Sequence, residues 1–196
     1  SRMVRFKTAA AVASLFVILG AVVEGAGTTA TLGHLGAVNA IAGSFTVALA
    51  AGVTIAWMTR ARLPVATSQA IVGGIVGWNL FTGSPTDLEV LSRIVATWLL
   101  SPLLAAIFAI LLYLLFKRCL GRARIHMLRL DAYTRTGLII VGALGSYTLG
   151  ANNIANVMGV FVPASPFRDI QLFGIFTLHG TQQLFLLGAL AIAVGI

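Results

Sequence analysis

Charged side chains are scarce in this sequence. Asp, Glu, Lys and Arg together make up 9% of its 196 residues, whereas a soluble domain carries roughly 25%. Hydrophobic residues make up 59%, and the mean hydropathy is +1.00. This composition excludes an ordinary soluble domain and predicts a membrane protein.

Acidic residues are rarer still, with five Asp and Glu against 13 Lys and Arg and a net charge of +8. The basic residues gather between apolar runs, as in cytoplasmic loops, and are not spread over a surface that would bind nucleic acid. Three of these basic segments, residues 2–7, 60–62 and 117–135, fall on one side if five apolar segments each cross the membrane. The positive-inside rule then predicts a plasma-membrane protein whose first residues are cytoplasmic.

Several kinds of chemistry are missing. The single cysteine, Cys119, excludes an internal disulfide. The three histidines, at positions 34, 126 and 179, have no metal-ligand spacing. No pair of catalytic carboxylates and no phosphate-binding loop is visible. We therefore expect no enzyme, no metal site and no cofactor.

Apolar runs dominate the remainder. A spanning helix needs about 20 mostly apolar residues, and four windows meet this length, at about residues 8–32, 40–58, 92–116 and 136–162. Pro102 predicts a kink in the third window. A last apolar run begins near Leu184. The sequence predicts an all-α polytopic transmembrane protein.

Residues 63–79 are apolar but short and rich in glycine. Pro64 can open a helix but cannot continue one, so Thr67, Ser68 and Gln69 are expected in the first turns. A short helix with a polar start is typical of re-entrant or broken segments that line a cavity. We expect this segment to cross overall, as two half-helices or beside a neighbour.

Three asparagines interrupt the window at 136–162, namely Asn152, Asn153 and Asn156, and they lie close to Gly150. Asparagine and glycine are poor helix formers, so we expect the helix to break here and to line a cavity. A helix N-terminus suits an oxyanion, and amide or hydroxyl oxygens suit Na⁺. Both polar clusters therefore predict an anion–cation symport site. The alternative is that the amides only hold helices together.

Glu24 lies inside the first window, where a carboxylate is a candidate to carry a proton or hold a cation. The alternative is an interfacial residue near the end of that span. Residues 18–21 with Gly27 resemble residues 186–189 with Gly195 at the same glycine spacing. Weak internal symmetry of this kind is typical of inverted-repeat transporters.

Three segments resemble motifs of the PiT-type inorganic phosphate transporters. Residues 150–156, GANNIAN, resemble that family's Gly-Ala-Asn-Asp-Val-Ala-Asn motif. Residues 64–73, PVATSQAIVG, are similar to its Pro-Val-Ser-Thr-Thr-His-Ala-Ile-Val-Gly motif, and residues 98–104 to its Trp-x-x-Ser-Pro-Leu segment. The resemblance implies two inverted repeats of broken helices around a phosphate and cation site. Residues 1–116 would end the first repeat, 117–135 would form a basic cytoplasmic loop, and 136–196 would begin a truncated second repeat, leaving half of each site absent.

Departures from these motifs bear on the chemistry. Asn153 stands where the family usually has aspartate, Gln69 replaces histidine and Ala66 replaces serine. Val17 stands where a glutamate is common, and Glu24 lies on nearly the same helix face and is a candidate to replace it. Sulfate is an alternative substrate, because hydrogen phosphate has a proton to donate and a neutral Asn153 offers no carboxylate to accept it.

The resemblance implies a secondary transporter of inorganic phosphate that works by alternating access with co-transported Na⁺ or H⁺. The expected substrate-binding residues are Asn152, Asn153, Asn156, Thr67, Ser68 and Gln69. Asn153, Thr67 and Glu24 are the expected residues for the coupling cation. A non-transporting membrane subunit is the alternative class, and a homodimer in the lipid bilayer is left open.

Overall fold

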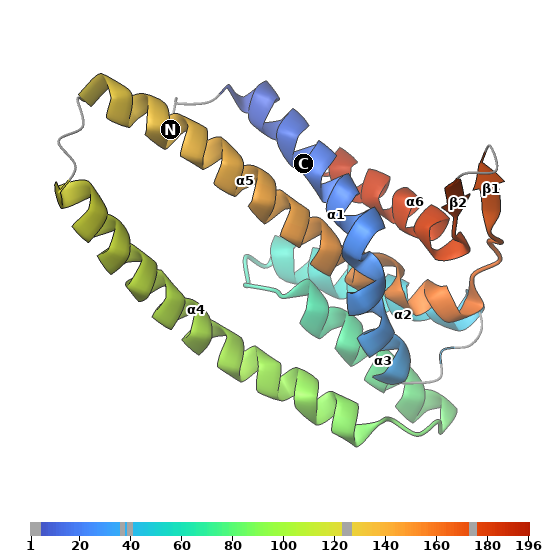
Figure 1. Ribbon diagram of the computed structural model, residues 1–196. Coiled ribbons are helices and arrows are strands. Elements are labelled where there is room, and N and C mark those ends of the chain that lie inside the picture. Colours follow the sequence, from blue (N-terminus) through green and yellow to red (C-terminus); the bar gives the residue numbers. More distant parts are fainter. Residues whose placement is uncertain (1–4, 36–37, 39–40, 123–126, 173–175) are drawn as a thin grey trace.

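The computed structural model describes residues 5–35, 38, 41–122, 127–172 and 176–196. Helices dominate this part of the chain (Figure 1). In chain order the elements are α1 (Phe6–Leu35), α2 (Ile41–Arg60), α3 (Thr67–Thr82), α4 (Leu88–Arg122), α5 (Met127–Met158), the 3₁₀ helix η1 (Gly159–Ala164), β1 (Ile170–Leu172), β2 (Phe176–Leu178) and α6 (Gly180–Val194).

Four helices, α1, α2, α4 and α5, are long and apolar enough to cross a membrane. They coincide with the four apolar windows, and the predominantly helical fold predicted from the sequence is confirmed. The last apolar run forms α6, which begins at Gly180. One feature was not predicted, the antiparallel β1–β2 hairpin in the polar connection before α6, where Ile170 pairs with Leu178.

Helices α1 and α5 run side by side and form the centre of the molecule (Figure 1). Their backbones touch at two glycines. A Cβ atom built on Gly20 would lie 1.9 Å from the carbonyl oxygen of Tyr147, and one on Gly150 would lie 2.1 Å from that of Val17. Small residues permit such close approach between membrane helices, where packing and not the hydrophobic effect drives association.

Helix α6 packs against this pair through a small apolar cluster of Ala21, Ile154, Phe185 and Ala189. Ala21 and Ala189 are the corresponding positions of the two similar segments seen in the sequence. On the other side of α5, helices α2 and α3 form a hairpin around Val47, Ile71 and Ile75.

Helix α4 is nearly free of the other helices. Its beginning packs on the core through residues such as Ile94 and Trp98, but every side chain from Leu99 to Cys119 is exposed. The helix continues through Pro102 without interruption. In a membrane this apolar surface would face lipid or further protein.

The predicted break at the asparagines is wrong. Helix α5 continues through all three and ends at Met158, and the backbone tightens into η1 only from Gly159. Packing against α1 holds this stretch helical, since Gly150 serves close contact and not a break, and tertiary packing outweighs intrinsic propensity. Helix α3 is likewise one uninterrupted helix of 16 residues and not two halves. It is about 24 Å long at 1.5 Å per residue.

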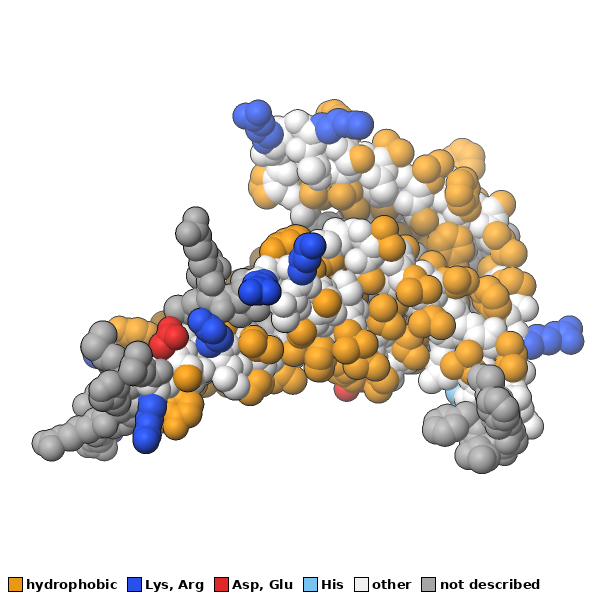
Figure 2. All heavy atoms as spheres, turned by 90° about the horizontal axis from the view of Figure 1, so that it is seen from above, with side chains coloured by type: hydrophobic (Ala, Val, Ile, Leu, Met, Phe, Trp, Pro, Cys, Tyr) orange, Lys and Arg blue, Asp and Glu red, His pale blue; other side chains and the backbone are white. Residues whose placement is uncertain are grey.

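The basic segments meet at one end of the molecule. The beginning of α1, the turn between α2 and α3, the end of α4 and the beginning of α5 all lie there (Figure 1). Figure 2 shows most Lys and Arg side chains toward the same end. Basic segments at one end are what the sequence predicts if the apolar segments between them each cross the membrane.

Candidate functional site

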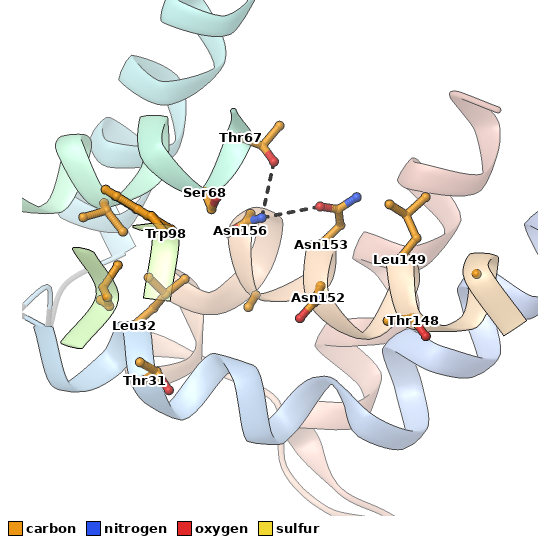
Figure 3. A pocket seen from close by; sticks show the side chains of 14 residues that line it. Thr31, Leu32, Thr67, Ser68, Trp98, Thr148, Leu149, Asn152, Asn153 and Asn156 are labelled. Carbon is orange, nitrogen blue, oxygen red and sulfur yellow. Dashed lines mark hydrogen bonds between the residues drawn. The ribbon is translucent and has the colours of Figure 1, made fainter. Parts of the chain in front are cut away.

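A cavity of about 720 Å³ lies between α1, α3, α4 and α5 (Figure 3). Its size is within the range of roughly 300–1,000 Å³ usual for small-molecule sites. Apolar side chains such as Leu32, Ile94 and Trp98 form part of its wall. The polar side chains on its wall are Thr31, Thr67, Ser68, Thr148, Asn152, Asn153 and Asn156.

One face of α5 supplies the amides. Gly145, Thr148, Asn152 and Asn156 follow one another at intervals of three or four residues, and all line the cavity. In an α-helix this spacing places side chains in a row along one face. The uninterrupted helix therefore presents the three asparagines together, and no break in the backbone is needed to do so.

The N-terminus of α3 meets this row. Ala66 precedes the helix in an extended conformation and has no side chain that could cap it. The first N–H groups of a helix have no acceptor within the helix and carry its positive dipole end. The side-chain amide of Asn156 donates to the Thr67 hydroxyl and to the side-chain oxygen Oδ1 of Asn153, each at 3.4 Å (Figure 3).

The polar groups of the cavity are uncharged, since no Asp, Glu, Lys or Arg is among the described residues that line it. Within the described ranges, no group of three His, Cys, Asp or Glu residues could hold a metal ion. Amide N–H groups, hydroxyls and a helix N-terminus can bind an oxyanion. Amide and hydroxyl oxygens on the same wall can bind a hard cation such as Na⁺.

Five of the expected site residues thus lie together, namely Thr67, Ser68, Asn152, Asn153 and Asn156. Gln69 lies elsewhere, in a groove between α2 and α3 that Thr54 and Trp78 also line. The reason is the helical rotation of about 100° per residue, which separates Gln69 from its two neighbours. Three consecutive helical residues cannot share one face.

Glu24 does not line the cavity either. Its side chain is exposed on α1 and lies close to Tyr147 of α5. Val17, which replaces the common glutamate, is fully buried at the contact between these helices. The cavity therefore gives no support to the predicted role of Glu24 in binding the coupling cation.

Thr31, Trp98 and Thr148 are among the cavity residues that were not predicted as part of the site. Thr148 was detectable, because it precedes Asn152 by four residues and so shares its face. Thr31 and Trp98 come from helices without any amide cluster, and their sequence carries no comparable signal.

Four helices of spanning length define a multi-pass membrane protein, and the cavity between them has the size of a small-solute site. The chain belongs to the phosphate transporter family, whose model matches residues 1–196. The family and its named relatives are transporters, which confirms the prediction that this is not an enzyme.

The names of individual relatives agree with this family. A Sodium-dependent phosphate transporter 1-A from Xenopus laevis is 27% identical over 187 residues, which is 89% of this chain and 26% of that protein. A Pyrococcus horikoshii protein named a phosphate permease is 36% identical over 80 residues, or 40% of this chain and 20% of that protein. The chain therefore matches only about a quarter of these relatives' length. No solved structure matches the chain.

Proposed function

We propose that the full-length protein containing this chain carries inorganic phosphate across the plasma membrane by alternating access, driven by co-transported Na⁺. The family supports phosphate as the substrate. The names of the two Xenopus relatives, both sodium-dependent phosphate transporters, favour Na⁺ over H⁺. Helix N-termini that point at an anionic substrate are typical of secondary transporters, and the N-terminus of α3 lines the cavity.

The observation that carries this proposal is the meeting of the α3 N-terminus with the asparagine row of α5. Phosphate oxygens would accept hydrogen bonds from the first N–H groups of α3 and from the Thr67 and Ser68 hydroxyls. The amide N–H groups of Asn152 and Asn156 would donate from the opposite wall. Asparagine oxygens and the Thr67 hydroxyl would hold Na⁺ beside the anion, so that each ion strengthens binding of the other.

Sulfate is the second candidate, because no carboxylate lines the cavity. A carboxylate would accept the proton of hydrogen phosphate and repel sulfate, which has no proton at neutral pH. The side-chain oxygens of the asparagines can also accept a hydrogen bond from hydrogen phosphate. Because they carry no charge, they do not repel sulfate. The geometry therefore predicts a preference for phosphate that is smaller than a carboxylate would give.

The test is uptake of labelled phosphate into proteoliposomes that hold the full-length protein, first with a Na⁺ gradient and then with a proton gradient. We expect uptake with Na⁺ alone and only partial competition by sulfate. Asn152→Ala and Thr67→Ala should each reduce uptake, whereas Gln69→Ala, its matched control in the neighbouring groove, should not. Uptake driven equally without Na⁺, or abolished by equimolar sulfate, would contradict the proposal. No uptake by the wild type would favour the non-transporting subunit.

The proposed orientation has its own test. Cys119 lies exposed near the end of α4, at the basic end that we place in the cytoplasm. In cells that express a variant with Cys119 as its one cysteine, a membrane-impermeant maleimide should label it only after the membrane is opened. Labelling of intact cells would reverse the orientation.

A further inference from the structure

A second groove lies between the two central helices and does not include any of the asparagines. It is formed by the first turns of α1 and the middle of α5, and its volume is about 240 Å³. Its walls are almost wholly apolar, with Val12 and Ala13 from α1 facing Leu138 and Ile139 from α5. Gly142 forms part of the wall, and nothing lies within 4 Å of a Cβ atom built there.

A basic residue precedes the lining residues of this groove on each of its two helices. Arg5 precedes the lining residues Thr8 and Ala9 by three and four positions, and the Ala9 N–H donates to the Arg5 carbonyl oxygen at 3.0 Å. Arg135 precedes Leu138 and Ile139 by the same intervals. Residues so spaced share a helix face. Arg135 therefore lies one turn beyond the apolar groove on the face of α5 that forms it, and Arg5 lies directly before the first turn of α1.

The direction of these side chains suits a membrane surface. Helical side chains lean toward the N-terminus of their helix, and here both helices begin at the basic end (Figure 1). This lean directs the Arg135 side chain away from the apolar groove and toward the basic end of the molecule, where Arg5 also lies. The positive dipole end of α1 adds to the attraction for an anion.

We propose that this groove binds an anionic phospholipid, with an acyl chain between α1 and α5 and the headgroup phosphate at Arg5 and Arg135. The charge at the mouth is complementary to an anionic headgroup, and basic sites between membrane helices recognise such lipids. The groove is too small for another helix, which is roughly 10–12 Å across, but suits one narrow chain. This inference does not depend on the transported substrate.

Native mass spectrometry of the full-length protein tests the proposal. The protein would be released from bilayers that contain equal amounts of phosphatidylglycerol and phosphatidylcholine, and the retained lipid would be counted. We expect phosphatidylglycerol to predominate. Arg5→Gln with Arg135→Gln should reduce its preference by about fivefold per charge removed, since each basic residue near an anionic surface contributes on that order. Arg168→Gln, beside the β1–β2 hairpin at the other end, is the matched control and should change nothing.

A second pair of variants tests the acyl-chain part. Gly142→Leu should fill the groove and abolish lipid retention, whereas Gly52→Leu, on α2 with open space around it, should leave retention unchanged. The proposal is overturned if the arginine variants keep the wild-type preference or if Arg168→Gln loses as much. It is also overturned if the wild type retains neither lipid, as it would if another part of the full-length protein occupied the groove.

Discussion

Asn156 and Thr67 are 89 positions apart in sequence, yet the amide of one donates to the hydroxyl of the other at 3.4 Å. This contact joins the two polar clusters that the sequence suggested separately. It is long for a hydrogen bond, so it contributes little to folding and leaves both groups available to a ligand.

Removing either partner should therefore affect binding more than stability. In the full-length protein, Asn156→Ala should weaken phosphate binding by roughly tenfold or more, because hydrogen bonds to a charged group are worth about 1.5–3 kcal/mol. Calorimetric titration with phosphate in the presence of Na⁺ measures this loss. The thermal midpoint should fall by only a few degrees, and a large fall with unchanged phosphate affinity would assign Asn156 to packing alone.

The glycine contacts between α1 and α5 predict severe effects of small changes. Gly20→Ala would place a Cβ atom 1.9 Å from the Tyr147 carbonyl oxygen, so the two backbones would have to separate. We expect a loss of roughly 1–3 kcal/mol, as for other overpacked sites, measured by thermal unfolding in detergent.

Gly27→Ala is the matched control on α1, because nothing lies within 4 Å of its Cβ position. Alanine favours helix over glycine by about 1 kcal/mol, so this variant should be neutral or slightly more stable. Equal destabilisation of both variants would show that the Gly20 contact is not tight.

Ser44 is fully buried, and its hydroxyl donates to the Val160 carbonyl oxygen at 2.6 Å. This bond ties α2 to η1, where the backbone leaves the regular helix. Ser44→Ala should cost about 1 kcal/mol, the usual value for a buried hydrogen bond. Thr46→Ala, whose exposed hydroxyl bonds only within its own helix, should cost less in the same unfolding assay, and a reversed order would contradict the role of Ser44.

Asp169 holds the beginning of α6. Its carboxylate accepts the Gly180 N–H at 2.8 Å and lies 3.1 Å from the His179 ring nitrogen. The Gly180 N–H and then His179 hold the pKa of Asp169 below its ordinary value. Because the folded-state pKa is the lower one, this stabilisation is complete above the ordinary aspartate range of about 3.9 and is lost as the pH falls through the folded-state pKa.

Asp169→Ala should therefore speed hydrogen exchange in the first turn of α6 at neutral pH, and lowering the pH through the folded-state pKa of Asp169 should remove the difference from wild type. Exchange measured by mass spectrometry at several pH values checks both effects, after correction for the intrinsic exchange rate. Asp131→Ala, an exposed acid on α5, serves as control and should leave the first turn of α6 unchanged.

Much of the fold could be predicted because apolar length alone locates spanning helices. The polar start of α3 followed from Pro64, which can open a helix but not continue one. The continuity of α5 through the asparagines could not be predicted, because local helix propensity favoured a break. Only the contact of Gly150 with Val17 shows why the helix persists. That contact joins residues 133 positions apart (150 − 17), and a single sequence does not contain it.

The candidate site was predictable to the extent that helical periodicity decides it. Asn152 and Asn156 share a face by their spacing, and the same rule could have separated Gln69 from Thr67 and Ser68. What periodicity cannot supply is which helices meet. Trp98 and Thr31 enter the cavity wall only because α4 and α1 come to lie beside α3 and α5.

The touching backbones of α1 and α5 also limit how these two helices can move relative to one another. Two helices whose glycines meet the partner's main chain cannot slide past one another without losing that contact. Helix α3, by contrast, meets the asparagine row through side chains, with a long hydrogen bond from Asn156 to Thr67 and apolar contacts around Ile71 and Ala155. The α1–α5 pair is thus held by its main chains, whereas the hairpin of α2 and α3 is held by side chains, among them the hydroxyl of Ser44.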